Sequence, residues 1–440
     1  MYYFVTTSTR YTHNLLADTS SLIYKAILAG LTYDVRVVPR GVRMTFGGYN
    51  DKLQRFAAYI SKKISREIKD ILPKDEDDFE RYKDLVSRTF AAFDVKQPYA
   101  HCASYSQLVL NPLKFQYSNR EMREETDKAT LDDLVAYVKT LWSTGKGLAL
   151  VQGNVDEKEA QKLVSTIDKA LEFQPILAEE YPPQLAPLPL PPISAKAKPT
   201  RLVISEPNPE NSNSASYVVL QGLSEDPKEN VLMELISSIV AEPFYEDLRT
   251  KQQLGYIVSS GLRGLGKTTF IGFIVQSSVA TNGKLTSEIL KYLDNVRPNL
   301  LEKLPNADFA VYVKSLIDRK TEPDKQLATE VTRNWAEIGS GRLQFDRVQR
   351  EVATLLDITK DDLIDFWDQL YIKDGRRVLV TEMVPRVGVA STKAPPTTTG
   401  YKADGSTGGD GPILGIDDIL QFRNDRDDFS SPSIDLERVA

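Results

Sequence analysis

The chain has few of the residues that build disulfides and metal centres. Its 440 residues include one cysteine, Cys102, and two histidines, His13 and His101. A single cysteine excludes an internal disulfide framework and suits a reducing compartment. A zinc site needs three or four ligands, and the adjacent His101 and Cys102 cannot both face one ion from a regular helix or strand. We therefore expect this chain by itself to bind no metal and no cofactor.

Long apolar runs and an excess of basic residues are also lacking. No run approaches the roughly 18 apolar residues of a membrane-spanning helix, and Met1–Thr7 shows no signal-peptide pattern. The formal net charge of −6 disfavours a nucleic-acid binder, which usually needs a basic face. The contents of 41% hydrophobic and 26% charged residues are ordinary for a globular protein. We expect a cytoplasmic protein without nucleic-acid or membrane partners.

Proline is concentrated in one segment. Eight of the 24 prolines lie within residues 175–199, and because proline fixes φ and removes a ladder donor, this segment is predicted to be an extended linker. It separates a first predicted domain, residues 1–174, from a second, residues 200–393. Residues 394–440 are predicted to be a mobile segment followed by a docking tail, in which Ile416–Arg423 forms a short helix.

The same order of elements is predicted on both sides of the linker. In the first half, a helix precedes a hairpin over residues 33–46, helices follow, and Gly147–Gly153 is predicted to be a buried strand. In the second half, a helix over Asn230–Arg249 precedes a hairpin over residues 256–275, helices follow, and Arg377–Val380 is the late strand. The repeat predicts an α+β fold of two homologous α/β sandwich domains, each a mainly antiparallel sheet with helices packed on one face.

Residues Gly261–Thr268 match the phosphate-binding pattern G-x-x-x-x-G-K-[ST]. A phosphate-binding loop of this kind also needs a helix beginning at its Lys-Thr pair, so that free N–H groups meet the phosphates. The residues that follow, Thr269–Val275, are β-branched and aromatic, with Gly272 among them, and this composition predicts a strand. The glycines suit a hairpin turn, so we expect no nucleotide to bind at Lys267.

Two side chains remain as candidates for chemistry. They lie in Leu248–Val258, which has the sequence Leu-Arg-Thr-Lys-Gln-Gln-Leu-Gly-Tyr-Ile-Val. From its place in the sequence alone, Arg249 is predicted to be a cation that complements the dipole at a helix end. Tyr256 would be a half-buried residue at the beginning of a strand.

This segment resembles Leu-Arg-Thr-Lys-x-Gln-Leu-Gly-Tyr-x-Val in the C-terminal half of the insulysin and pitrilysin family. Members of that family are zinc peptidases whose catalytic helix carries H-x-x-E-H, a motif absent from this sequence. Further similar landmarks occur in order over residues 20–425: Gly47–Lys52, Gln97–His101, Gln152–Val155, Asn334–Ile338 and Phe345–Arg347. The chain therefore resembles the half that does not bind zinc.

The resemblance implies the C-terminal half of an insulysin-like zinc metalloendopeptidase, forming one wall of a closed peptide-degrading chamber. Zinc would be held by an N-terminal half, in the same polypeptide or in a separate chain. That half and peptide substrates would be the partners, and a homodimer is compatible with the resemblance. Arg249 matches an arginine that contacts the substrate backbone, and Tyr256 matches a tyrosine that supports the carbonyl oxygen as it becomes an oxyanion. This chain alone is expected to be inactive.

One alternative and one departure from the family pattern stay open. A catalytically silent subunit of the same fold class would act as a structural or substrate-presenting partner, and Arg249 and Tyr256 would then have no purpose. The family's lysine-rich anion patch corresponds here to Glu322–Gln326, in which only Lys325 is basic. This departure puts regulation by polyanions in doubt.

Overall fold

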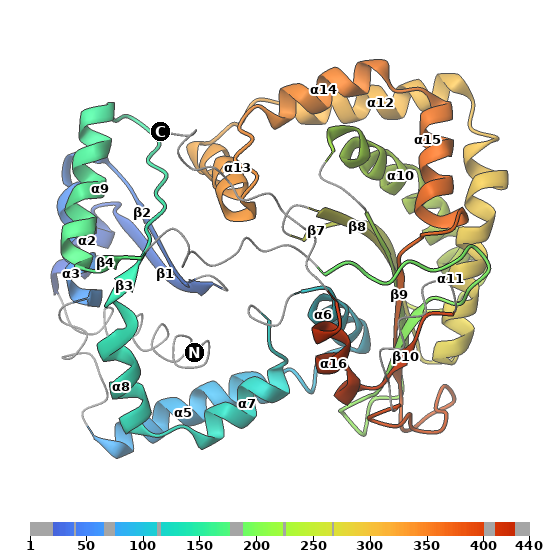
Figure 1. Cartoon of the computed structure of the whole chain (residues 1–440), viewed down its shortest axis with the longest axis horizontal. Coiled ribbons are helices and arrows are strands. Elements are labelled where there is room, and N and C mark those ends of the chain that lie inside the picture. Colours follow the sequence, from blue (N-terminus) through green and yellow to red (C-terminus); the bar gives the residue numbers. More distant parts are fainter. Residues whose placement is uncertain are drawn as a thin grey trace. The chain divides into compact units, whose positions relative to one another are not determined.

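The computed structural model describes eight stretches of the chain: residues 21–38, 41–65, 75–111, 116–176, 188–222, 226–265, 268–399 and 410–426. They fall into two compact units (Figure 1). The first unit is drawn from residues 1–93, 117–183 and 326–331. The second is drawn from residues 94–116, 184–325 and 332–440. Residues 94–116 therefore belong to the second unit although they precede the proline-rich segment.

A hairpin forms the centre of one part of the first unit. Strands β1 (Thr32–Val38) and β2 (Gly41–Gly47) pair antiparallel over seven residue pairs. The helices α2 (Ser21–Leu28), α3 (Asn50–Ser65) and α9 (Glu157–Leu171) complete this part, and α9 packs along α3. Its core contains Ile23, Leu31, Val35, Phe56, Ile60 and Ile64.

Three helices form a second, smaller core in the same unit: α5 (Glu76–Ala91), α7 (Asn119–Lys128) and α8 (Leu131–Leu141). They pack around Phe79, Met122 and Leu134. The N-terminus of α8 is fixed by a capping box, since Thr130 accepts the N–H of Asp133 and the Asp133 carboxylate accepts the N–H of Thr130. An equivalent box of Ser118 and Glu121 begins α7.

The predicted buried strand at Gly147–Gly153 is wrong. Residues 146–152 have no strand structure, and Leu148 is 53% exposed. The local strand pairing is confined to β3 (Thr144–Gly145) and β4 (Gln174–Pro175), which are parallel. An apolar composition does not make a strand unless neighbouring backbone satisfies its N–H and C=O groups.

The second unit is built on a six-stranded mixed sheet with the order β10-β5-β9-β6-β8-β7 (Figure 1). Its strands are β5 (Thr200–Ser205), β6 (Ser214–Gln221), β7 (Ile257–Leu265), β8 (Thr268–Ser277), β9 (Val378–Val384) and β10 (Ile413–Leu414). The pairs β10–β5 and β5–β9 are parallel, and the other three pairs are antiparallel. The late strand β9 lies between β5 and β6, and all its residues are buried.

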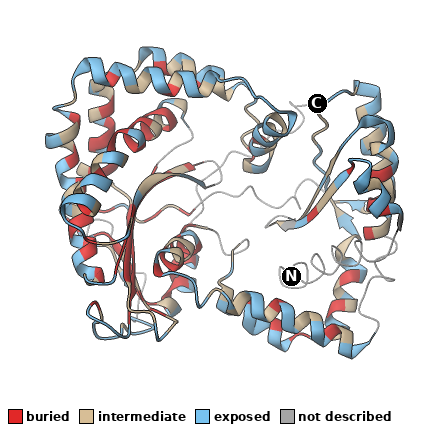
Figure 2. Cartoon of the chain, turned by 180° about the vertical axis from the view of Figure 1, so that it is seen from behind, coloured by how far each residue is buried: buried red, intermediate tan, exposed pale blue. Residues whose placement is uncertain are grey.

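Helices cover both faces of this sheet. On one face, α10 (Pro227–Tyr245) and α11 (Asn282–Val296) pack against Val218, Phe273 and Val380. On the other face, α6 (Pro98–Leu110) and α16 (Ile419–Asn424) pack against the strand side chains that point to that face, such as Val219 and Leu379. The strands are largely buried (Figure 2). The predicted α+β fold class is confirmed. Helices were predicted on one face of the sheet, and α6 and α16 cover the second face as well.

Further helices follow along the chain, and several of them pack against α10 or α11. They are η4 (Arg297–Leu301), α12 (Asn306–Thr321), α13 (Leu327–Ser340), α14 (Arg347–Asp357), α15 (Lys360–Trp367) and η5 (Asp368–Ile372). The described part of the proline-rich segment adheres to this unit, since Gln221 accepts the N–H of Leu190 and donates to the carbonyl of Leu188. At the C-terminal end, η6 (Ile416–Asp418) leads into α16, which confirms the predicted short helix.

Candidate functional site

The site begins where α10 changes its winding. This helix continues into η3 (Glu246–Lys251), a π-helical turn in which the N–H of Gln252 donates to the carbonyl of Asp247. Leu248 in this turn is fully buried and anchors it in the core, whereas the neighbouring Arg249 is only partly buried. Single π-turns inside α-helices are frequent at functional sites. Here the turn holds Arg249 at the end of a rigid helix.

A tight connection then leads into β7. Gln253 has a φ of 53°, in the left-handed region, and Leu254 is 8% exposed and anchors the connection to the core. A Cβ at Gly255 would lie 1.8 Å from the carbonyl oxygen of Gln276 on β8. Only glycine permits this close approach of two backbone segments. The position of Tyr256 is therefore fixed on both sides.

Arg249 and Tyr256 lie against each other. Arg249 Nη1 donates to the carbonyl oxygen of Gly255 at 2.8 Å, and its guanidinium carbon is 4.9 Å from the centre of the Tyr256 ring. Tyr256 is 81% exposed. The half-buried position that the local sequence pattern predicts for this tyrosine is therefore wrong. A guanidinium over an aromatic face gains about 0.5–1 kcal/mol at an exposed site. The pair is thus a preorganised surface group with a phenol and further guanidinium N–H groups available to a ligand.

A third element reaches the same place from the beginning of α6. Gln276 Oε1 accepts the backbone N–H of Tyr99 at 3.0 Å, and Gln276 Nε2 donates to Oε1 of Gln97 at 2.9 Å. The carbonyl of this same Gln276 is the atom that requires glycine at position 255. The residues Gln97–Tyr99 had no predicted contact with the Arg249 segment. Their only sequence signal was the similarity of Gln97–His101 to a family landmark.

The two other sequence features, the His-Cys pair and the phosphate-loop pattern, have structural roles. His101 and Cys102 are buried in α6, where burial lowers the pKa of His101 and raises that of Cys102. His13 and Lys267 lie outside the described residues. The residues after the glycine-rich loop form β8, as predicted, and Leu265 pairs with Thr268 across the hairpin.

Among the described residues, no group of three or more His, Cys, Asp and Glu side chains could hold a metal ion. Within the same residues, no helix is both long and apolar enough to cross a membrane.

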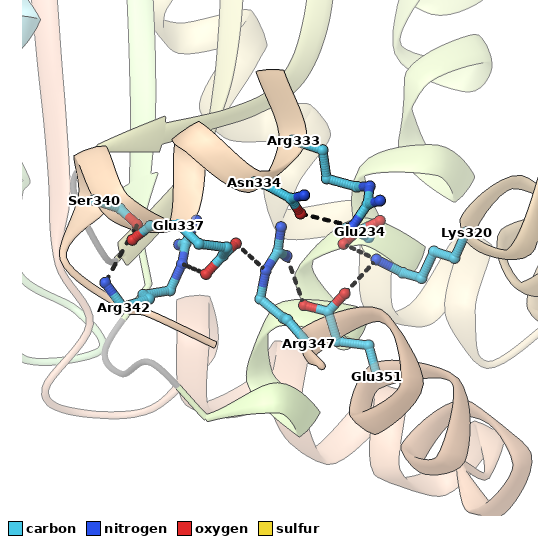
Figure 3. A network of polar contacts seen from close by, with 9 residues as sticks. All are labelled: Glu234, Lys320, Arg333, Asn334, Glu337, Ser340, Arg342, Arg347 and Glu351. Carbon is cyan, nitrogen blue, oxygen red and sulfur yellow. Dashed lines mark hydrogen bonds and ion pairs between the residues drawn. The ribbon is translucent and has the colours of Figure 1, made fainter. Parts of the chain in front are cut away.

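Buried charges gather at α10, α12, α13 and α14 (Figure 3). Glu337 and Glu351 are 4% and 1% exposed. Arg347 pairs with both at 2.8 and 2.9 Å, and Lys320 joins Glu351 to Glu234. Burial opposes the charge of Arg347, but Glu351 and Glu337 outweigh it and raise the pKa of the guanidinium. Paired carboxylates and cations of this kind tie helices together.

The segment before α13 is also internally paired. Lys325 contacts Glu322 at 2.7 Å, and Arg333 contacts Asp324 at 2.8 Å. Each of these two cations therefore already has a carboxylate partner, Glu322 or Asp324.

Comparisons with known proteins agree with this architecture. Residues 6–125 match the family described as "Middle or third domain of peptidase_M16", and residues 235–335 match "PQQ synthase PqqF-like, C-terminal lobe domain 4". The insulin-degrading enzyme of Homo sapiens is 30% identical over 366 residues, which cover 82% of this chain and 34% of that protein. The peroxisomal insulin-degrading enzyme-like 1 of Arabidopsis thaliana is 28% identical, over 98% of this chain and 41% of its own length.

Solved structures show the same fold. Pitrilysin superposes with a TM-score of 0.79 at 17% identity, covering 98% of this chain and 42% of its own. A structure titled as the peptidase M16 inactive domain from Pseudomonas fluorescens has a TM-score of 0.56 at 12% identity, covering 85% of each chain. The chain thus spans 34–41% of the length of the two relatives named above. Arg249 and Tyr256 lie within the residues matched to domain 4 of a C-terminal lobe.

Proposed function

We infer the function of this chain from its membership of the insulysin and pitrilysin family of peptidases, to whose C-terminal half it corresponds. We propose that it forms one wall of a closed chamber in which a zinc metalloendopeptidase degrades peptides and unfolded segments. The proposal includes a zinc-binding N-terminal half as partner, within the same polypeptide or as a separate chain. It also includes a cytoplasmic location, although the name of one relative places that protein in peroxisomes.

The observation that carries the proposal is the Arg249–Tyr256 pair. An aromatic side chain that is 81% exposed is held by a helix end, a glycine-only connection and a guanidinium. Rigid placement of this kind has no evident packing purpose, but it is what a group that orients a reacting substrate requires. The described residues do not fit zinc. The metal chemistry is therefore assigned to the other half, and this chain contributes substrate contacts.

Each of the two side chains has a distinct role in the proposal. Arg249 uses one N–H for the carbonyl of Gly255, and its remaining donors face the backbone carbonyls of a bound peptide. The hydroxyl of Tyr256 donates to the oxygen of the scissile carbonyl, on which negative charge develops during attack. A fixed donor at such an oxygen is worth roughly 2.7–4 kcal/mol in the transition state. It contributes less to binding of the ground state.

Replacing single atoms tests the role of Tyr256. In the peptidase assembled with its zinc-binding half, Tyr256→Phe is expected to lower kcat by roughly 10²–10³-fold with an unchanged melting temperature. Arg249→Ala should place more of its loss in KM. Tyr245→Phe is the matched control, because Tyr245 is also exposed, at 47%, and lies just before η3. A Tyr256→Phe enzyme with the kcat of the unmodified enzyme would contradict the proposal.

The silent-subunit alternative is favoured by one comparison, the likeness to the structure titled as an inactive domain. If it holds, the chain presents or encloses substrate without touching the reacting atoms. Substitution of Arg249 or Tyr256 would then leave kcat unchanged, while removal of the chain would abolish activity. The same kinetic series separates the two functions.

A further inference from the structure

The sheet of the second unit ends on one side in a long strand with a free edge. β7 is the terminal strand, and it pairs with β8 over nine consecutive residue pairs, from Ile257–Gln276 to Leu265–Thr268. Among the described residues, β8 is the only strand that pairs with β7. No other described strand occupies the alternate N–H and C=O groups of β7 that face away from β8, although the carbonyl of Leu262 accepts a hydrogen bond from Arg263 Nη1 at 3.0 Å.

β7 lacks the devices that usually protect an edge. Its sequence, Ile-Val-Ser-Ser-Gly-Leu-Arg-Gly-Leu, contains no proline and one charged residue, Arg263. The uninterrupted pairing with β8 leaves no room for a bulge. The middle of the strand, Ser259–Gly261, has small side chains that let another backbone approach closely. The opposite edge of the sheet differs, because it ends in the two residues of β10.

The position of this edge indicates what occupies it. β7 begins at the residue after Tyr256, and Arg249 is fixed beside that tyrosine. A chain paired with β7 would therefore run directly past the two side chains that we assign to the substrate. Contacts through the main chain, with small side chains at the centre, recognise an extended backbone and tolerate many sequences. This property suits a peptidase that accepts varied peptides.

We propose that β7 binds an extended segment of the substrate peptide as an additional strand. The inference rests on the proposed function and extends it: the edge supplies affinity for any extended peptide with free amide groups, and Arg249 and Tyr256 act where that strand begins. A folded substrate or a helical peptide would not be recognised.

The main-chain hydrogen bonds can be tested with a pair of peptides that differ only in their donors. The probe is a fluorescein-labelled ten-residue peptide of alternating Thr and Val, and its partner carries N-methyl groups on the alternate amides of one edge. The full chain should bind the unmodified peptide at least about 10-fold more tightly than the weaker of the two N-methylated forms, which differ in the edge that is methylated, and about as tightly as the other form, as measured by fluorescence anisotropy. Equal affinity for all forms would overturn the proposal.

Two neighbouring substitutions locate the binding edge. Adjacent residues of an antiparallel strand direct their N–H groups to opposite edges, so one of Ser259→Pro and Ser260→Pro removes an outward donor and the other breaks the ladder to β8. Hydrogen exchange of the amides of Phe270–Gln276 shows which variant keeps its hairpin. That variant should lose at least about 10-fold in affinity for the unmodified peptide, and wild-type affinity in it would contradict the inference.

Other occupants and the proposed function remain distinguishable. If a second copy of the chain pairs at β7, sedimentation will show a dimer. The proline variant that removes an outward N–H donor should dissociate this dimer. Peptide binding that does not compete with the dimer would overturn the inference. Tyr245→Phe, at an exposed tyrosine with no assigned substrate contact, should leave the affinity for the unmodified peptide unchanged. Amide-dependent binding together with a normal kcat for Tyr256→Phe would therefore refute the catalytic role alone.

Discussion

The two units contain hairpins of similar design in different surroundings. β1 and β2 pair over seven residues and form a sheet of two strands, whereas β7 and β8 pair over nine residues at the end of a sheet of six. The same contrast applies to the late apolar segment of each unit. Residues 147–151 form no strand and expose Leu148, whereas β9 lies between two partners with every residue buried. The contrast indicates that an apolar run becomes a strand only when at least one neighbouring strand pairs with its backbone N–H and C=O groups.

Replacing one leucine in each of the two late apolar segments should give the largest difference between the units. Leu379→Ala in β9 removes a fully buried side chain from the sheet and is expected to lower the free energy of unfolding by about 3 kcal/mol. Leu148→Ala, in the corresponding segment of the first unit, should stay within about 0.5 kcal/mol, because Leu148 is 53% exposed. Urea unfolding measures both. A large loss for Leu148→Ala would show that this segment is packed as a strand after all.

The connection into the second hairpin should be the next most sensitive point. Gly255→Ala places a methyl group 1.8 Å from the carbonyl oxygen of Gln276, so the backbones must separate, at a cost of about 2 kcal/mol. Gly264→Ala, in the same hairpin, is the control because its Cβ would meet nothing within 4 Å. Thermal unfolding should show a lower midpoint for Gly255→Ala alone. Equal midpoints for the two variants would mean that the connection relaxes freely.

A buried carboxyl group makes the stability of the second unit depend on pH. Glu206 follows β5, and burial raises its pKa to about 7, against the opposing effects of the N–H of Asn208 and the charge of Arg386. The folded chain therefore keeps a proton that the unfolded chain releases above pH 4.5, so stability is greatest below pH 4.5 and falls as pH rises through about 7. Glu206→Gln should stabilise the chain at pH 8 by on the order of 1 kcal/mol, and much less at pH 4.5. The exposed Glu210→Gln serves as the control in urea titrations at both values, and an equal gain at both pH values would contradict the prediction.

Equivalent helix caps should show the smallest difference between the units. Thr130 begins α8 and Thr359 begins α15 with the same capping box, and replacement of either by Ala should cost about 1 kcal/mol. The loss at Thr359 should be the smaller, since its partner Asp362 keeps its contact with Lys228 at 2.7 Å when the threonine hydroxyl is removed. Lys228, followed by Thr359, lowers the pKa of Asp362 to about 2. The extra stability is therefore present above pH 3.8 and is lost as pH falls through about 2. Equal losses for the two variants at pH 7 would assign no effect to Lys228.

Local patterns predicted the elements of the second unit well. The helix over Asn230–Arg249 corresponds to α10 and η3, the hairpin over residues 256–275 to β7 and β8, and the late strand to β9. Glycine and β-branched residues determine such elements through short-range sterics, which are visible in a single sequence. The strand-like residues after Thr268 likewise argued against a phosphate-binding loop, and β8 confirms that strand.

The assembly of the candidate site was only partly predictable. Arg249 and Tyr256 were chosen by resemblance, and their roles stay a prediction. Their mutual contact and the exposure of Tyr256 come from the structure. The approach of Gln97–Tyr99 to the site depends on Gln276, 177 positions away from Tyr99. A contact between residues so distant in the chain leaves no local pattern.

Most helices and both hairpins follow from the amino-acid sequence alone, because backbone sterics and alternating polarity act over a few residues. Tertiary structure alone decided three things. It placed α6 on the second face of a sheet built from the other half of the chain, and it inserted β9 between β5 and β6. It also left residues 147–151 without a strand. In each case the physical reason is the same: burial and backbone hydrogen bonding are completed by partners that are remote in sequence, and only the folded chain brings those partners together.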